Sequence, residues 1–283
     1  MQVIREIDQL RDLIGNERRL GKRIGFVPTM GNLHEGHYSL LSIAREHAEL
    51  TVASIFVNPT QFGVGEDFSR YPRTPEEDRA GLSGKGCDVL YLPEQEAIYP
   101  FGLERAVKIC VPELGDMLEG AKRPGHFDGV ATVVARLFNL VQPDLAVFGN
   151  KDYQQLLVVR RMTRDLGFPV RIIGAPIIRE ANGLAMSSRN QYLDGQQRET
   201  AGVIHSTLQR MCERAVAGIE TLAQIEADAS ASLSSAGLSP DYALFRRAED
   251  LGAPSDRRGE DLVALIAARL GPVRLLDNQV LRR

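Results

Sequence analysis

The sequence predicts an α/β protein in which a parallel β-sheet covered by helices is followed by a smaller α+β unit. Three observations predict this class: the length of 283 residues, short β-rich apolar runs that alternate with helical segments, and a change of this pattern after about Ile178. At roughly 150 residues per domain, the length allows about two domains or one large one. Strands that alternate with helices are typical of a parallel sheet.

Five apolar runs rich in β-branched and aromatic residues predict the strands of the sheet. They are Ile24–Val27, Val52–Val57, Val89–Leu92, Leu145–Phe148 and Val170–Ile178. Apolar residues at the helical period predict the helices between them, namely Leu40, Leu41, Ala44 and Ala48 after the first run, and Val130, Val133, Val134, Leu137 and Leu140 later. Ligands of open α/β sheets bind at the carboxyl ends of strands, where the strand order reverses, so we expect the functional residues there.

A second, smaller unit is predicted after Ile178. It opens with a polar stretch, Asn190–Arg198, and continues with two helical periods: Ile204, Leu208, Met211 and Ala215, then Leu222, Ile225, Ala229 and Leu233. Three strand-like segments close the chain, Tyr242–Phe245, Leu262–Ala267 and Val273–Leu276. We expect them to form a small antiparallel sheet beside these helices.

The charge balance argues against a broad nucleic-acid-binding surface. Lys and Arg number 34 against 37 Asp and Glu, for a net charge of -3, whereas nucleic-acid binding domains are usually strongly basic. A small anionic ligand needs only a local cluster of positive charge. The composition therefore permits a small anionic substrate and predicts no nucleic-acid partner.

The cysteines and the apolar runs predict a cytoplasmic protein without a membrane segment. Cys87, Cys110 and Cys212 have no paired spacing, as expected of free thiols in a reducing compartment rather than of a disulfide framework or a zinc site. The first residues, Met1–Glu6, lack the pattern of a secretion signal. The longest uncharged run, Leu50–Gly65, is interrupted by polar residues, and no run reaches the roughly 18 apolar residues of a membrane span.

The first predicted strand leads into a pair of histidines at the start of a helix. The segment Pro28–Leu33 is followed by His34, Glu35, Gly36 and His37. Histidines at i and i+3 share one helix face, and at a helix N-terminus the free backbone N–H groups and the dipole favour an anion. Gly36 lets a flat or bulky group approach the backbone.

Three other interpretations of this segment compete with an anion site. The phosphate-binding loop pattern is half matched, since Gly31 and Gly36 have the right spacing, but His37 and Tyr38 stand where Lys and Ser or Thr belong. The zinc-protease pattern H-E-x-x-H fails because Tyr38 occupies the place of its second histidine. Two ordinary polar residues at a helix end remain as the plain alternative.

Further polar clusters follow other predicted strands. In Phe148–Gln155, Lys151 offers a mobile charge and Asp152 can accept hydrogen bonds from ribose hydroxyls. In Met186–Asn190, two hydroxyls and one guanidinium suit phosphate oxygens, although a solvated loop explains the same residues. In Phe56–Gly63, Gln61 offers an amide.

Two more segments add local positive charge and are equally compatible with structural turns. They are Arg70–Thr74 and Arg123–Phe127. Their sequence alone does not decide between the two roles.

Taken together, these motifs resemble the pantothenate synthetase (pantoate–β-alanine ligase) family over nearly the whole chain. The matching segments run in order from Pro28–Gly31 and His34–His37 through Phe56–Pro59, Lys151–Gln155 and Met186–Asn190 to the closing Asp277 and Asn278. The histidine motif alone would indicate only the wider nucleotidyltransferase superfamily, and the serine cluster resembles an altered form of that superfamily's KMSKS motif. Asn150 and Arg136 depart from the family, which usually has Glu and often Lys there.

The resemblance implies an AMP-forming ligase. Pantoate and ATP would give pantoyl adenylate and pyrophosphate, and β-alanine would then displace AMP to give pantothenate, a precursor of coenzyme A. The resemblance further implies Mg²⁺ accompanying ATP, with no metal held by the protein itself, and a homodimer. Two alternatives stay open: a related adenylyltransferase that acts on another small acid or a phosphorylated acceptor, and a non-catalytic nucleotide-binding protein.

Roles for individual residues also follow from the resemblance. His34, His37, Lys151 and Arg189 would be catalytic and would contact the phosphates, and Gln61 and Gln155 would bind pantoate or β-alanine. The remaining ATP-binding residues would be Met30, Gly31, Gly36, Gly149, Asp152, Ile178, Met186, Ser187 and Ser188. Residues 1–178 would form a Rossmann-like domain that binds nucleotide and pantoate, and residues 179–283 a smaller domain that covers the site.

Overall fold

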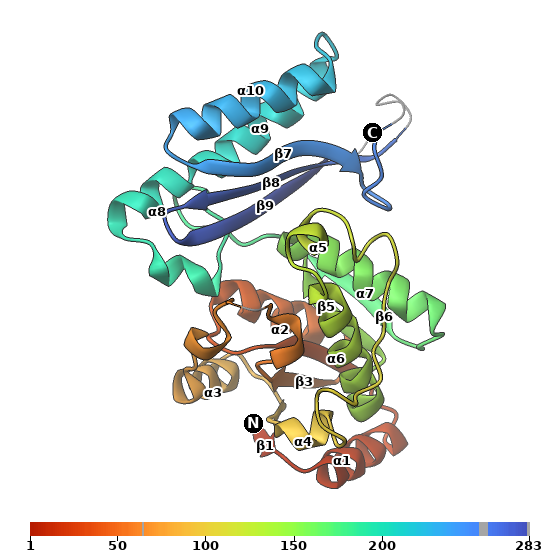
Figure 1. Cartoon of the computed structure of the whole chain (residues 1–283). Helices are drawn as coiled ribbons and strands as arrows, with labels where there is room; N and C mark the ends of the chain where they lie inside the picture. Colours follow the sequence, from red (N-terminus) through yellow and green to blue (C-terminus); the bar gives the residue numbers. More distant parts are fainter. Residues whose placement is uncertain (64, 255–259, 282–283) are drawn as a thin grey trace. The chain divides into compact units, whose positions relative to one another are not determined.

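The computed structural model describes residues 1–63, 65–254 and 260–281. The chain divides into two compact units (Figure 1). The first unit comprises Met1–Asn150 and Gln154–Pro176, and the second comprises Lys151–Tyr153 and Ile177–Arg283. Among the described residues, no helix is both long enough and apolar enough to cross a membrane.

The first unit is built on a six-stranded sheet in the order β1-β4-β3-β2-β5-β6, and every neighbouring pair is parallel. The strands are β1 (Gln2–Ile4), β2 (Ile24–Thr29), β3 (Leu50–Ile55), β4 (Val89–Tyr91), β5 (Leu145–Gly149) and β6 (Arg171–Ala175). The chain leaves β2 toward β3 and β4 on one side and later adds β5 and β6 on the other. The strand order therefore reverses between β2 and β5, which is where such sheets bind ligands.

Helices cover both faces of this sheet. The α-helices are α1 (Ile7–Arg19), α2 (Glu35–His47), α3 (Pro75–Gly84), α4 (Gln95–Ile98), α5 (Glu119–Lys122), α6 (His126–Val141) and α7 (Tyr153–Asp165), and the 3-10 turns are η1 (Pro59–Gln61), η2 (Phe68–Arg70) and η3 (Asn150–Asp152). Successive residues of β2 face opposite sides. Val27 packs against α2, whereas the Phe26 ring lies edge-on to Phe138 of α6, with ring centroids 6.4 Å apart.

The predicted fold class is confirmed, with changes at the strand boundaries. The predicted strand Val170–Ile178 is shorter in the structure, as β6, and Phe56 and Val57 lie beyond the end of β3. The sequence prediction missed β1, because three residues are too few to display a period. The predicted helical periods coincide with buried residues of α2 and α6, except that Ala48 is the half-buried C-cap residue just after α2.

The second unit contains the predicted helices and antiparallel sheet. Its elements are η4 (Ser188–Tyr192), α8 (Gly195–Ala201), α9 (Val203–Ala217), α10 (Leu222–Ser235), β7 (Ser239–Arg247), β8 (Leu262–Leu270) and β9 (Val273–Leu281). The sheet order is β7-β8-β9, antiparallel throughout, and its residues share one apolar core with α9 and α10. The polar stretch Asn190–Arg198 is partly helical, because Asp194 and Gln197 form a capping box at the start of α8.

One close approach fixes η1 against α6. A Cβ on Gly129 of α6 would lie 2.5 Å from the carbonyl oxygen of Thr60 and 2.7 Å from the backbone nitrogen of Gln61. Both neighbours are backbone atoms, which cannot rotate away as the end of a side chain can. Only glycine fits this contact without movement of η1 or α6.

Gly129→Ala is therefore expected to lower the free energy of unfolding by about 1–3 kcal/mol, the usual cost of overpacking. The matched control is Gly15→Ala in α1, where an added Cβ meets no atom within 4 Å. Gly15→Ala should be neutral or stabilise the protein by up to about 1 kcal/mol, through helix propensity. Urea denaturation measures the free energy of unfolding of both variants. Equal values for the two variants would contradict the expected overlap between a Cβ at position 129 and the backbone of η1.

Candidate active site

The predicted site residues are divided between the two units. Met30, Gly31, His34, Gly36, His37, Gln61, Gly149 and Gln155 belong to the first unit, and Lys151, Asp152, Ile178, Met186, Ser187, Ser188 and Arg189 to the second. In the first unit, β3, β2 and β5 are neighbours and run parallel. Their carboxyl ends therefore share one edge of the sheet, where Met30 follows β2, Gln61 follows β3 and Gly149 ends β5.

His34 and His37 form a reciprocal cap at the start of α2. His34 is the N-cap residue, and its Nδ1 accepts a hydrogen bond from the backbone N–H of Gly36 at 3.1 Å. His37 Nδ1 accepts from the backbone N–H of His34 at 3.3 Å. The two rings lie side by side, with centroids 4.2 Å apart.

This cap fixes the tautomer of both neutral rings. A neutral imidazole carries one N–H, so a ring that accepts a hydrogen bond at Nδ1 has its proton on Nε2. We assign the Nε2–H tautomer to His34 and His37 on this ground. Each ring then presents an N–H donor at its outer nitrogen, the kind of group that binds a phosphate oxygen.

The backbone N–H groups of the turn before α2 are not the anion donors that the sequence suggested. Buried Asp78 of α3 accepts from Asn32 N at 2.8 Å and from Leu33 N at 2.7 Å. Gly31 N lies 3.2 Å from the hydroxyl of Thr29. With His34 N and Gly36 N also bonded to the histidine rings, side chains take the donors that a phosphate-binding loop would present. The expectation of free N–H groups is therefore wrong for Gly31, Asn32, Leu33, His34 and Gly36.

Asp78 is the residue that the sequence analysis missed at this turn. Its carboxylate accepts two backbone N–H groups and the hydroxyl of Thr74, at 3.2 Å. Gly31 has a φ of +86°, and a Cβ there would lie 3.0 Å from the Asp78 carboxylate, so the turn and the carboxylate fit only with glycine. In the sequence, Asp78 is one of three acidic residues in the first turn of α3, a pattern that helix N-termini commonly show.

Gln61 is held by a buried polar network. Asn58 donates from Nδ2 to the carbonyl oxygen of Gly129 at 3.1 Å and to Gln61 Oε1 at 3.2 Å. A carbonyl oxygen can only accept, which fixes the orientation of the Asn58 amide. Gln61 Oε1 is thus an occupied acceptor, and Gln61 Nε2 lies 3.1 Å from Met30 Sδ. The network turns the N–H₂ group of Gln61, rather than its oxygen, toward Met30 and away from Asn58.

The adjacent glutamines of α7 have different environments. Gln154 is buried, donates to the carbonyls of Leu114 and Met117 at 2.7 and 2.8 Å, and accepts from Glu119 N at 3.1 Å. It therefore holds the segment before α5. Gln155 is only half-buried on the first turn of α7. Of the two, Gln155 is the one suited to a soluble ligand.

In the second unit, a short hairpin brings Ile178 and Met186 together. Met186 N donates to the Ile178 carbonyl at 3.0 Å, and Arg179 and Ala185 form a β-bridge. The Ser187 hydroxyl caps η4 by accepting from Arg189 N at 3.3 Å. The segment is therefore an ordered hairpin and 3-10 turn, in which residues 186–189 are half-buried.

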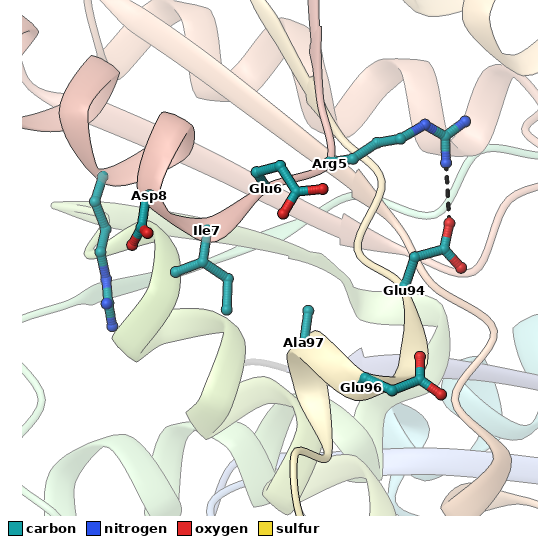
Figure 2. Close-up of a pocket in the computed structure, with 8 residues that line it drawn as sticks. Arg5, Glu6, Ile7, Asp8, Glu94, Glu96 and Ala97 are labelled. Atoms are coloured by element: carbon teal, nitrogen blue, oxygen red, sulfur yellow. Dashed lines mark hydrogen bonds and ion pairs between the residues drawn. The ribbon is translucent and has the colours of Figure 1, made fainter.

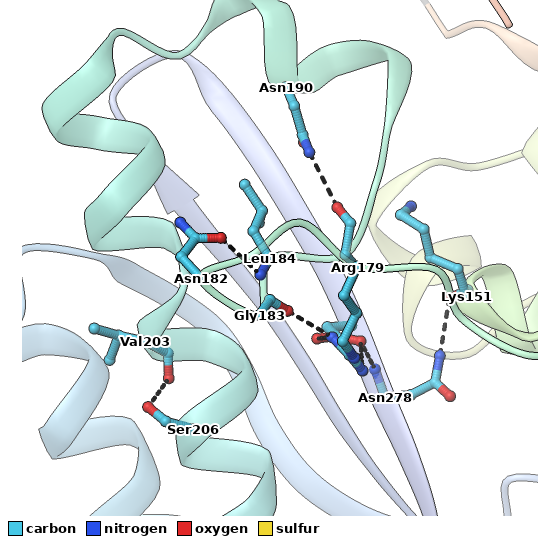
Figure 3. Close-up of polar contacts among 11 residues, drawn as sticks. Lys151, Arg179, Asn182, Gly183, Leu184, Asn190, Val203, Ser206 and Asn278 are labelled. Carbon is cyan, nitrogen blue, oxygen red and sulfur yellow. Dashed lines mark hydrogen bonds and ion pairs between the residues drawn. The ribbon is translucent and has the colours of Figure 1, made fainter. Parts of the chain in front are cut away.

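Strand β9 supports both Lys151 and this hairpin (Figure 3). Asn278 Nδ2 donates to the backbone carbonyl of Lys151 at 2.9 Å. The neighbouring Asp277 is buried and forms a bidentate ion pair with Arg179, at 2.6 and 3.0 Å. The Lys151 ammonium lies 3.4 Å from the carboxylate of Asp152. The sequence marked Asp277 and Asn278 only through the resemblance, and the structure gives them this supporting role.

The two departures from the family fit their surroundings. Arg136 donates to the Ile98 carbonyl at 2.7 Å and stacks on the ring of Tyr99, 5.2 Å from its centroid. The Tyr99 hydroxyl in turn donates to Asn58 Oδ1 at 2.7 Å, so Arg136 supports the network around Gln61. Asn150 Oδ1 lies against Gly174, where a Cβ would be 2.3 Å away.

A separate surface pocket of about 420 Å³ lies in the first unit (Figure 2). Its lining residues are Arg5, Glu6, Ile7, Asp8, Arg11, Glu94, Glu96 and Ala97, none of them a predicted site residue. Four carboxylates against two guanidinium groups do not suit an anionic ligand, and Arg5 is already paired with Glu94 at 3.2 Å. Within the described ranges, no group of three or more His, Cys, Asp or Glu side chains is arranged to hold a metal ion.

Comparisons with known proteins agree on one family. The profile of the pantoate-beta-alanine ligase family matches residues 2–280. The pantothenate synthetase of Stenotrophomonas maltophilia strain K279a is 56% identical over 278 residues, 98% of this chain and 99% of the relative. That of Xylella fastidiosa strain M12 is 54% identical over 281 residues, with the same coverage.

Solved structures agree over the whole chain. A pantothenate synthetase of Thermus thermophilus superposes with a TM-score of 0.91 at 46% identity and 99% coverage of both chains. The pantoate-beta-alanine ligase of Francisella tularensis, solved with beta-gamma ATP and β-alanine, superposes with a TM-score of 0.82 at 32% identity, covering 99% of this chain and 97% of that one. On the fold, the ordered motifs and these matches, the chain belongs to the pantoate–β-alanine ligase family.

Proposed function

We propose that this chain uses ATP to condense pantoate with β-alanine through a pantoyl adenylate intermediate. The carboxylate of pantoate attacks the α-phosphorus and pyrophosphate leaves; the amine of β-alanine then attacks the acyl carbon, loses a proton, and AMP leaves. Membership of the family supports the condensation, and the complex of the Francisella relative with beta-gamma ATP and β-alanine supports these two substrates.

The observation that carries the proposed first step is that His34 and His37 each accept a backbone hydrogen bond at Nδ1. In that step an anion attacks a polyanion, so the protein must place donors on the phosphates and hold the reacting groups in line. Neutral His34 and His37, each with its Nδ1 occupied as an acceptor, supply Nε2–H donors without adding negative charge. An acid at either position would repel both substrates.

The other predicted residues take matching roles in this proposal. Lys151 contacts phosphate oxygens as a point charge, and Ser187, Ser188 and Arg189 bind the β- and γ-phosphates. Backbone groups and side chains of Met30, Gly31, Gly36, Gly149, Asp152, Ile178 and Met186 bind ATP. Gln61 and Gln155 bind pantoate, because an amide donates to a carboxylate and accepts from a hydroxyl.

Three further features belong to the proposal. ATP enters as its Mg²⁺ complex, since a hard cation that stays with the phosphates needs few protein ligands. Two copies of the chain form a homodimer. The protein works in a reducing cytoplasm, which is supported by its three unpaired cysteines.

Release of AMP and pyrophosphate from ATP tests the reaction. With pantoate and β-alanine present, we expect AMP, pyrophosphate and pantothenate in equal amounts, and with pantoate alone at most one pyrophosphate per site. AMP formation independent of both substrates would overturn the ligase proposal. Turnover with a phosphorylated acceptor but without β-alanine would instead identify an adenylyltransferase, and ATP binding without turnover a non-catalytic binder.

The histidine donors are tested by amide substitutions at His37. Glutamine reaches the place of Nε2 and keeps a donor there, whereas asparagine reaches only the place of Nδ1. We expect His37→Asn and His37→Ala to slow pyrophosphate release by about 10²- to 10³-fold, the usual cost of one such donor, and His37→Gln to retain more activity than either. Single-turnover measurements with pantoate give the rates.

Circular dichroism and thermal unfolding serve as the control for these variants, since each should keep the fold. Higher activity of His37→Asn than of His37→Gln would show that the capping role of Nδ1 is what matters. Stoichiometric zinc in the purified protein, lost together with activity in the variants, would favour a metal centre.

The two proposed pantoate residues are tested against the buried glutamine beside one of them. Gln61→Ala and Gln155→Ala should raise the KM for pantoate by about 10-fold or more and change the KM for ATP little, because binding sites discriminate steeply when polar groups lose their partners. Gln154→Ala should instead lower the melting temperature, since it leaves three buried or part-buried backbone groups without a side-chain partner. Equal loss of ATP and pantoate affinity in Gln61→Ala would refute its assignment.

A further inference from the structure

The backbone carbonyl of Gln61 is a second point at which this residue is held. His126 Nδ1 lies 2.7 Å from that oxygen, and Arg123 Nη2 lies 3.3 Å from it. His126 is the first residue of α6, and Arg123 lies just before that helix. His126 therefore reaches Gln61 from the helix that already contacts η1 at Gly129, and Arg123 reaches it from the segment just before that helix.

The hydrogen bonds of His126 determine its protonation. A carbonyl oxygen only accepts, so Nδ1 must carry the proton, and Nε2 of the neutral ring is then an acceptor. Arg123 Nη1 lies 3.0 Å from Nε2 and is a donor. A doubly protonated ring would instead direct an N–H at the guanidinium. Burial, together with the positive charge of Arg123, lowers the pKa of His126 to about 4, in agreement with a neutral ring.

Arg123 is itself held by Glu66. The carboxylate accepts from Nε at 2.7 Å and from Nη2 at 2.6 Å, in a bidentate ion pair that is about three-quarters buried. Although burial opposes it, the hydrogen bonds from Arg123 lower the pKa of Glu66. Glu66 follows Gln61 by five residues, so the three side chains and the Gln61 carbonyl form a connected set of contacts beside η1.

Helix α6 thus fixes both sides of the Gln61 main chain. On one side Gly129 lies against the Gln61 nitrogen, and on the other His126 binds the Gln61 carbonyl. The side-chain amide is oriented by Asn58, which also bonds to the Gly129 carbonyl. A change at His126 therefore reaches the Gln61 amide through the main chain, without contact between His126 and that amide.

We propose that His126 is a positioning residue for pantoate: its neutral ring, itself held by Arg123, binds the Gln61 carbonyl and so sets the direction of the Gln61 amide. This inference rests on the proposed role of Gln61 in pantoate binding. His126 needs only the donor at Nδ1 for this purpose. The role requires neither a charged ring nor contact with substrate.

Two amide substitutions test the roles of the two ring nitrogens of His126 separately. His126→Asn places an N–H₂ group near Nδ1 and keeps the donor to Gln61, whereas His126→Gln extends past it and keeps only a group near Nε2. We expect His126→Gln to raise the KM for pantoate about 10-fold, as for loss of one buried hydrogen bond. For His126→Asn, the KM for pantoate should stay within about 3-fold of that of the unchanged protein. The KM for ATP should not change in either variant. Steady-state kinetics with each substrate varied in turn measure this.

His47→Gln in the last turn of α2 is the matched control and should leave both KM values unchanged. If Gln61→Ala leaves pantoate binding intact, the proposed role of Gln61 fails, whatever His126 does. If Gln61→Ala raises the KM for pantoate while His126→Gln does not, only the role of His126 is overturned. The role of His126 is also overturned if both His126 variants raise the KM for pantoate and the KM for ATP equally. Should His126→Gln not fold, Glu66→Gln tests the same contacts and should raise the pantoate KM about 3-fold; no change would overturn the inference.

Discussion

The backbone N–H groups between β2 and α2 are the constraint on which the first unit's site depends. A strand that turns directly into a helix leaves several such donors without helical partners. Here side chains satisfy them: Asp78 takes two, and the rings of His34 and His37 take one each. These bonds occupy donors that a glycine-rich phosphate loop would offer, and in the proposed reaction the Nε2–H groups of the two imidazoles act in their place. The same contacts that complete the helix cap thus fix the tautomer of the two rings that the proposed function places on the phosphates.

Around η1, buried polar groups likewise orient one side chain, that of Gln61. Asn58, Tyr99 and Arg136 form a chain of contacts to the Gln61 side chain, and His126 binds its carbonyl. Buried polar groups are costly when they lack partners, so a network in which each member is bonded has a single favourable arrangement. In the proposed function, the Gln61 amide is therefore oriented before pantoate binds, which lowers the entropy lost on binding.

In the second unit, one strand orders two chain segments that are distant in sequence. Asn278 bonds to the backbone of Lys151, and Asp277 pairs with Arg179 at the start of the hairpin that contains Met186. The pairing of a nearly fully buried carboxylate with two guanidinium nitrogens requires good geometry, since desolvation of both charges opposes it. It fixes the position of the hairpin more than it adds to stability.

The sequence by itself determined the alternation of strands and helices, the change of architecture after the sheet, and the motifs that identify the family. These features are local: periodicity in α2 and α6, apolar runs in β2 and β5, and short ordered motifs such as His34–His37. It did not reveal Asp78, the buried contacts of Gln154, or the bonds of Arg123 and His126 to the Gln61 carbonyl. Only the tertiary structure decided these points, because each depends on which backbone groups from remote segments lie within hydrogen-bonding distance. Residue type and spacing in the sequence do not determine that distance.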